Sequence, residues 1–218
     1  MKKIYTLCLV AIAAMFANNA FAQKDVEMYA FVGSAADKSN IPVTIYLVNP
    51  TVEVTAIEAS FTAPVSVNKF IYDEAKESWK IEDTDRWYDQ HSAKCAAGTA
   101  LHGSGNFFIS VTNSEVKPFK EKEGAVATVY FDGSELAEGD YVVTMLDALA
   151  VDTKVQSYSV ANVDASFHVN GDGTITAVGA IAAEAVAAGK DIYTIGGQKV
   201  TAPQKGQIYV VDGKVVKY

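Results

Sequence analysis

Apolar and polar residues alternate with a period of two along most of the chain between residues 26 and 169. The apolar positions of these runs are Val43, Ile45 and Leu47; Ile57, Ala59 and Phe61; Phe107, Ile109 and Val111; Ala127, Val129 and Phe131; Tyr141, Val143 and Met145; and Val163, Ala165, Phe167 and Val169. This period is typical of strands that bury one face and expose the other. Turn residues separate the runs, and no convincing amphipathic helix lies between them. The pattern therefore predicts an all-β protein, an antiparallel jelly-roll β-sandwich.

A polar stretch at residues 72–101 interrupts this alternation. It holds both tryptophans of the chain, Trp79 and Trp87, together with Tyr88 and His91. An insertion of this length is unusual in a compact domain and often carries function. We expect it to contain a short helix or an irregular pair of strands.

The first 22 residues have the pattern of a secretory signal peptide. Lys2 and Lys3 precede an apolar stretch at residues 7–16, and Ala20-Phe21-Ala22 forms a small-residue cleavage site. The stretch is too short to span a bilayer, which takes about 20 apolar residues. We therefore predict an exported protein without a transmembrane segment, found outside the cell or on its outer surface.

Composition changes again after the last alternating run. Residues 171–190 are rich in alanine and read as a linker with marginal helix propensity. This places the sandwich at residues 23–170 and a small β-hairpin module at residues 191–218. In that module Asp212-Gly213 is a strong signal for a two-residue hairpin turn, because both central positions of a type I′ turn need positive φ.

The charge balance narrows the range of partners. The whole chain carries a net charge of −8, and without the two lysines of the leader it carries 16 basic and 26 acidic residues. Such an acidic chain is a poor nucleic-acid binder, because that affinity comes from Lys and Arg on phosphates. Cys95 is the one cysteine after the leader, so no internal disulfide can form. We expect it to be a buried or incidental thiol.

Catalytic and metal-binding patterns are weak. His91, His102 and His168 belong to no H-E-x-x-H motif, and the chain has no G-x-S-x-G motif; His102 and Ser104 lie two residues apart in a glycine-rich segment. The stretch Asn170-Gly171-Asp172-Gly173 resembles half of a calcium loop but lacks the bidentate acid at its end, so it predicts a turn. We assign no catalytic residue, metal or cofactor.

Aromatic residues in the polar insertion offer a candidate ligand surface. Sugars bind proteins through stacking on aromatic rings together with nearby carboxylates and amides. The candidate glycan-binding residues are Trp87, Tyr88, Trp79, Asp85 and Asp89, with Arg86 and Gln90 as further polar groups. The alternative is that the tryptophans cap the core, because Trp is highly buried on average. We favour that alternative for Trp79, while both readings stay open for Trp87 and Tyr88.

Several strand sequences resemble those of cohesin-like domains, a jelly-roll family related to carbohydrate-binding modules. The resemblance is carried by residues 41–45 with 56–61, by residues 124–131, and by residues 139–144 with 147–152. It implies a β-sandwich. Two features depart from the family. The glycine that is usual before the strand at 56–61 is replaced, and the insertion at 72–101 is not typical. Binding of a dockerin, the partner of true cohesins, is therefore not implied.

The last residues, at 192–200 and 205–218, resemble the C-terminal sorting modules of proteins exported by the type IX secretion route. This resemblance implies that the export machinery is a partner of the tail. Together these features predict a secreted or cell-surface, non-enzymatic protein that binds a glycan or an envelope protein. The alternatives are a structural or adhesive subunit of a surface assembly and, third, a hydrolase.

Overall fold

The computed structural model describes residues 25–98, 105–177, 191–194, 199–200, 208–211 and 214–217 of the chain. Its contacts form two compact units, one of Asp25–Val178 and one that contains the C-terminal strands. The predicted leader, His102 and Ser104, and residues 178–190 of the predicted linker lie outside the described residues. No helix among the described residues is long and apolar enough to cross a membrane.

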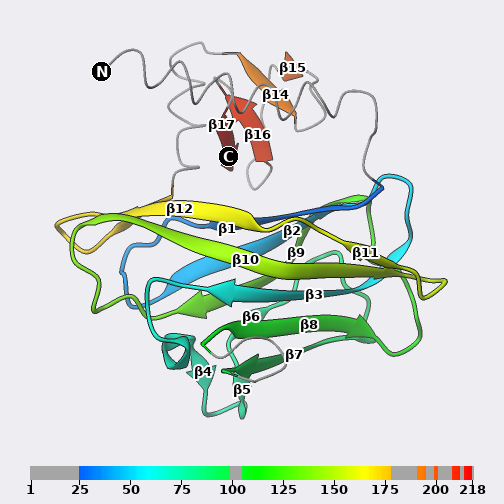
Figure 1. Cartoon of the computed structure of the whole chain (residues 1–218), viewed down its shortest axis with the longest axis horizontal. Coiled ribbons are helices and arrows are strands. Elements are labelled where there is room, and N and C mark those ends of the chain that lie inside the picture. The colour runs from blue at the N-terminus through cyan, green and yellow to red at the C-terminus, as the bar shows by residue number, and fades with distance from the viewer. Residues whose placement is uncertain are drawn as a thin grey trace. The chain divides into compact units, whose positions relative to one another are not determined.

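The larger unit is built from two antiparallel sheets (Figure 1). The first has the strand order β1-β2-β9-β6, with the bounds Glu27–Val32, Ile41–Val48, Glu123–Phe131 and Ile81–Glu82. The second has the order β13-β12-β10-β3-β8-β7, with the bounds Ile175–Ala177, Val163–Val169, Gly139–Asp152, Val54–Thr62, Phe107–Asn113 and His91–Ala97. A further strand, β11 (Ser157–Ser159), pairs with β10.

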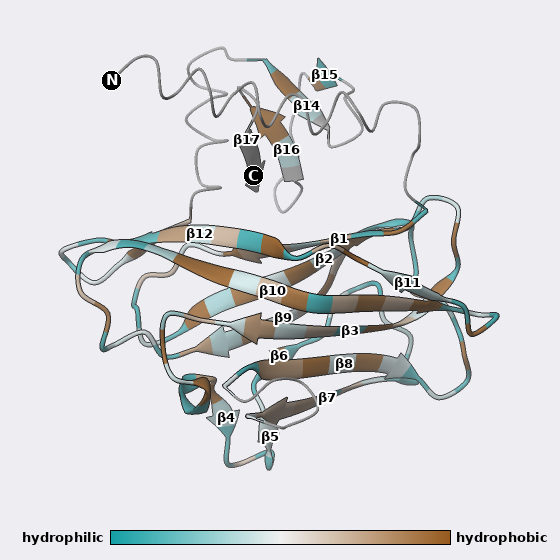
Figure 2. Ribbon diagram, viewed as in Figure 1, coloured by the Kyte–Doolittle hydropathy of each residue, from teal (hydrophilic) through white to brown (hydrophobic). Residues whose placement is uncertain are grey.

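The core lies between the two sheets and consists of the apolar faces of the alternating strands. Figure 2 shows hydrophobic and hydrophilic residues alternating along these strands. Phe61, Val129, Phe131 and Phe167 are fully buried, as the period-two pattern predicts. Tyr141 is only half-buried, because it stacks on the edge of the core at 5.7 Å from Phe167. Its hydroxyl donates to the carbonyl of Ala137 at the surface.

The set of residues that strand β10 turns toward the core changes along the strand. Met145 and Ala148 are both buried, although three positions separate them. The register against β3 shifts between Leu146 and Leu149, and Asp147 at this point has a φ of 50°. This β-bulge turns the even-numbered residues of the second half of the strand inward.

The insertion takes the second of its two expected forms, a short pair of strands, whereas the end of the sandwich differs from expectation. Residues 72–97 hold no α-helix; they form a small hairpin of β4 (Tyr72–Asp73) and β5 (Ser78–Trp79), and they add β6 and β7 to the two sheets. A one-turn 3-10 helix, η1, precedes them at Val67–Lys69. The sandwich also continues past residue 170, because β13 pairs with β12 and bridges to Ala35. Strand β13 therefore corrects the expected linker start at residue 171.

The C-terminal unit is a four-stranded antiparallel sheet in the order β15-β14-β16-β17. The bounds are Lys199–Val200, Ile192–Thr194, Ile208–Val211 and Lys214–Lys217. Val211 pairs with Lys214 across the second hairpin, whose connecting Asp212 and Gly213 lie outside the described residues. The prediction of an antiparallel all-β sandwich followed by a small β module is confirmed.

Candidate functional site

The segment between β6 and β7 folds as two consecutive tight turns. The backbone N–H of Trp87 donates to the carbonyl of Thr84, and the N–H of His91 donates to the carbonyl of Tyr88. The hydroxyl of Thr84 also accepts from the N–H of Arg86. Within these turns Arg86 is buried and Trp87 is half-buried, whereas Asp85, Tyr88 and Asp89 are exposed.

Arg86 fixes this segment to the sandwich. Its side chain is buried, with the residue 5 % exposed, and its guanidinium donates five hydrogen bonds. The acceptors are the carbonyls of Lys120 (2.7 Å), Leu47 (2.9 Å), Gly124 (3.0 Å) and Glu121 (2.9 Å) and Oδ1 of Asn49 (2.8 Å). All five donors of the fork are therefore used.

This arrangement corrects the expected role of Arg86 as a ligand contact. The guanidinium points into the protein, where burial lowers its pKa to about 10, so it stays charged at neutral pH. The backbone of Lys120 also donates to the carbonyl of Arg86, so the two segments are joined in both directions. Arg86 thus holds the segment in place, and its guanidinium donors are all used within the protein.

Gly124 makes room for the Arg86 side chain. Its φ is +145°, and a Cβ at this position would lie 3.1 Å from Cδ of Arg86. Only glycine combines this backbone conformation with such a close approach. The glycine at the start of β9 is therefore needed by the buried arginine.

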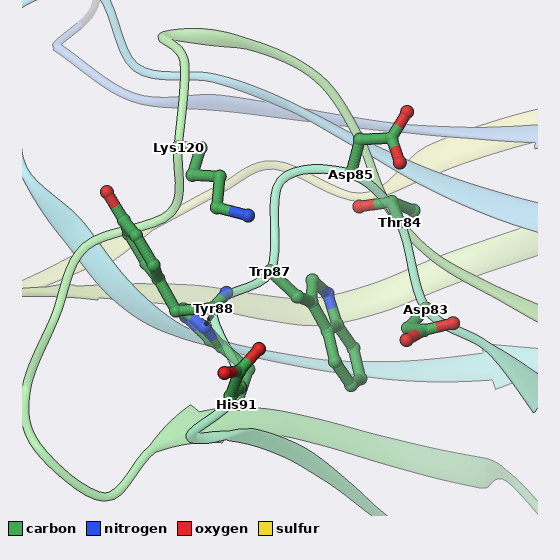
Figure 3. Close-up of a pocket in the computed structure, with 8 residues that line it drawn as sticks. Asp83, Thr84, Asp85, Trp87, Tyr88, His91 and Lys120 are labelled. Atoms are coloured by element: carbon green, nitrogen blue, oxygen red, sulfur yellow. Dashed lines mark hydrogen bonds between the residues drawn. The ribbon is translucent and has the colours of Figure 1, made fainter.

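A surface pocket of about 460 Å³ lies over this segment (Figure 3). It is lined by Asp83, Thr84, Asp85, Trp87, Tyr88, Asp89, His91 and Lys120. Four of the five predicted ligand-binding residues, Trp87, Tyr88, Asp85 and Asp89, thus lie around one pocket. Lys120 comes from a different segment, and no motif in the sequence pointed to it.

The two aromatic residues of the pocket differ in exposure. Tyr88 is 41 % exposed, and Nζ of Lys120 lies 4.9 Å from the centre of its ring. Trp87 is half-buried against the core, and its indole N–H donates to the carbonyl of Val126. Of the two readings left open by the sequence, exposure thus holds for Tyr88 and packing against the core for Trp87.

Three carboxylates of the pocket are free of hydrogen bonds and ion pairs in the described part of the protein. Asp83, Asp85 and Asp89 are exposed, and none of them accepts a hydrogen bond or forms an ion pair with a described residue. Lys120 is the one cationic side chain that lines the same pocket. The pocket thus offers unused carboxylate oxygens beside an exposed ring, with a net negative charge.

Trp79 lies outside this pocket. Its ring packs edge-on against Phe107 at 5.1 Å and against Tyr72 at 5.4 Å. It is half-buried at the edge of the core, in agreement with the capping alternative. Trp79 and Trp87 belong to the same insertion in the sequence, but in the fold Trp79 packs beside Phe107 and Trp87 lines the pocket.

Cys95, His168 and Asp172 do not line the pocket. Burial raises the pKa of the Cys95 thiol to about 12, so this side chain is a neutral thiol at physiological pH. His168 pairs with Asp140 at an exposed position, and Asp172 caps the turn between β12 and β13 through the N–H of Thr174. No group of His, Cys, Asp or Glu in the described ranges has the arrangement of a metal site.

Comparisons with known proteins find similarity at the level of structure. No protein-family model matches the sequence, and no curated protein matches it. Similar solved structures include a cohesin module from a family 33 glycoside hydrolase of Clostridium perfringens, with 14 % identity over 66 % of this chain and 98 % of that chain and a TM-score of 0.48. A non-cellulosomal cohesin from Archaeoglobus fulgidus has 15 % identity over 65 % and 90 % of the two chains and a TM-score of 0.45. The sixth cohesin of scaffoldin B from Acetivibrio cellulolyticus has 10 % identity over 65 % and 97 % and a TM-score of 0.45.

Proposed function

We propose that the sandwich is a non-enzymatic binding module and that its pocket at residues 83–91 recognises a glycan. The observation that carries this proposal is the exposed ring of Tyr88 beside three exposed carboxylates that accept no hydrogen bond and form no ion pair within the described part of the chain. A binding site needs such unused polar groups together with an apolar surface that orients the ligand. The fixed position of Arg86 lowers the entropy that the segment would lose on binding.

The chemistry of the pocket fits a sugar. The C–H face of a sugar ring packs on an exposed aromatic side chain, and sugar hydroxyls donate hydrogen bonds to carboxylates. Asp85 and Asp89 are exposed on the same two-turn segment as Tyr88. The ammonium of Lys120, close to the tyrosine ring, adds a donor for ring or hydroxyl oxygens of the sugar.

A glycan array tests this proposal with a matched pair of variants. Tyr88 and Tyr72 have almost the same exposure, 41 % and 42 %, but only Tyr88 lines the pocket. We expect the protein without its leader to bind a subset of glycans, Tyr88→Ala to lose that binding at least tenfold, and Tyr72→Ala to keep it. Absence of any glycan binding, or equal losses in both variants, would contradict the proposal.

A structural subunit of a surface assembly is the second candidate, and strand β7 favours it. This seven-residue strand forms one edge of its sheet and pairs only with β8 within the described residues. Such an edge can accept a strand from another chain. The exposed Lys94 at its centre opposes uncontrolled pairing. Concentration-dependent association in size-exclusion chromatography, lost in a Ser92→Pro variant, would favour this candidate.

We also propose that the protein is exported and held at the cell surface. The support is the signal-peptide pattern of the first 22 residues and the resemblance of residues 192–218 to sorting modules. In this view the small terminal sheet is an address, and the sandwich meets glycans or envelope proteins outside the cell. Cell fractionation of full-length and tail-deleted protein tests this location.

A further inference from the structure

His91 connects the pocket to the segment that follows β8. Its Nδ1 lies 2.9 Å from the backbone nitrogen of Tyr88 and 3.1 Å from Nδ2 of Asn113. A backbone N–H can only donate, so Nδ1 must accept, and the proton of the neutral ring is on Nε2. The other side of Asn113 is equally fixed, because its Oδ1 accepts from the N–H groups of Glu115 and Lys117.

The surroundings of His91 keep its ring neutral. The residue is 7 % exposed, and its ring stacks on Phe119 at 4.6 Å. Burial lowers the pKa of His91, and the positive charge of Lys120 lowers it further. Its Nε2 is buried without a hydrogen-bond partner in the described part of the chain.

The charged groups around His91 come from three segments. Asp83, Asp85 and Asp89 line the same pocket and favour a charged ring, as does Glu115 beyond Asn113. Lys120 and Lys117 oppose it, as does Arg86, whose guanidinium lies 5.7 Å from the other ring in the stack, Phe119. These longer-range charges do not change the local geometry at Nδ1, which lies against two hydrogen-bond donors.

We propose that His91 is a positioning residue that holds Tyr88 in place only while its ring is neutral. Protonation puts a hydrogen on Nδ1, which then faces two donors, the N–H of Tyr88 and the amide of Asn113. Both contacts must break, so acidification frees Tyr88 and loosens its tie to residues 113–117. That this also weakens ligand binding rests on the proposed function of the pocket.

The free energy of unfolding also depends on the protonation of His91. An unperturbed histidine has a pKa of about 6.5, and the folded protein takes up this proton at lower pH than the unfolded chain does. The unfolded state therefore binds more protons between the two pKa values, and the free energy of unfolding falls as the pH drops through that window. Above the window this contribution to stability is fully present.

Nuclear magnetic resonance on residues 23–218 tests the proposal without any ligand. Nitrogen shifts of the His91 ring report which nitrogen carries the proton, and hydrogen exchange gives the protection factor of the Tyr88 amide between pH 7.5 and pH 5. His91→Asn keeps an acceptor close to the place of Nδ1 but cannot titrate. His168→Asn is the matched control, because His168 is exposed on the outer face of β12 and pairs with Asp140.

We expect the ring proton on Nε2 at pH 7.5 and at least a tenfold loss of Tyr88 protection as His91 becomes charged. This loss should persist in His168→Asn and disappear in His91→Asn. A proton on Nδ1 at pH 7.5 would overturn the proposal, as would Tyr88 protection that stays within twofold through the titration. Should His91→Asn not fold, the wild-type titration alone decides, and none of these outcomes depends on whether a glycan binds.

Discussion

Nη2 of Arg86 donates to Oδ1 of Asn49 at 2.8 Å, across 37 positions of sequence. Asn49 is itself fully buried, and its Nδ2 donates to the carbonyl of Val52 at 2.7 Å. The pair ties the segment that carries the pocket to the loop after β2. The position of Tyr88 and the three aspartates thus depends on an arginine whose side chain is buried inside the protein.

Replacing Arg86 should therefore cost far more stability than replacing Asn49. Arg86→Lys removes the planar fork and leaves carbonyl acceptors without donors, so we expect a loss of about 3 kcal/mol or more. Asn49→Ala removes fewer hydrogen bonds, and we expect about 1–2 kcal/mol. Urea unfolding followed by tryptophan fluorescence measures both, because the two tryptophans of the chain lie in the sandwich. Equal effects would show that the fork is not the anchor.

Gly124 should resist substitution more strongly than another glycine of positive φ. In Gly124→Ala the new methyl group meets Cδ of Arg86, in addition to the cost of the backbone conformation. Gly139, with a φ of +154° and only an ordinary contact of 3.9 Å from its missing Cβ to Tyr141, is the control for the backbone cost alone. We expect Gly124→Ala to be the more destabilising by about 1–2 kcal/mol, the lower part of the range for overpacking. A smaller loss than in Gly139→Ala would mean that Arg86 moves aside freely.

Truncation of the buried phenylalanines tests the assignment of strand faces. Phe61 and Phe131 are completely buried on β3 and β9, so each change to Ala should cost about 3–5 kcal/mol. Val142→Ala, at an exposed position of β10, should change the free energy of unfolding by less than about 0.5 kcal/mol. A loss below about 1 kcal/mol for either phenylalanine would mean that its side chain does not face the core.

Removal of the tail should separate folding from localisation. We expect a protein that ends at residue 190 to keep the thermal transition of the sandwich but to remain in the periplasm. A protein that ends at residue 170 also loses β13, whose Ile175 and Ala177 are buried, and its transition should fall by several degrees. Circular dichroism and cell fractionation give the two readouts. Surface delivery without the tail would show that residues 192–218 are not an address.

The period-two pattern was sufficient to predict the strands with alternating large apolar residues, such as those of Phe61, Phe131 and Phe167. It missed β7, where His91-Ser92-Ala93-Lys94-Cys95-Ala96-Ala97 has small residues in place of large apolar ones. It also missed the bulge at Asp147, because the apolar residues on both sides of it look like two separate strands.

Part of the candidate site could be predicted from the sequence. Tyr88, Asp85 and Asp89 stood out as aromatic and acidic residues in a long polar insertion. Arg86 looked like one more polar residue of that insertion, because the carbonyls that bury it come from Leu47, Lys120, Glu121 and Gly124, far along the chain. The contribution of Lys120 to the pocket depends on the same long-range contacts and has no local signal.

The central claim is that the pocket at residues 83–91 binds a glycan. It is tested most directly by mapping the changes in backbone amide shifts while a glycan is titrated into the protein. The glycan is the one that the array shows to bind best, and the protein is residues 23–218 labelled with nitrogen-15. The largest shift changes should fall on Tyr88, Asp89 and Lys120, which line the pocket. Largest changes along β7, or on Tyr72 and Trp79, with the pocket amides unmoved, would contradict the assignment of the binding site.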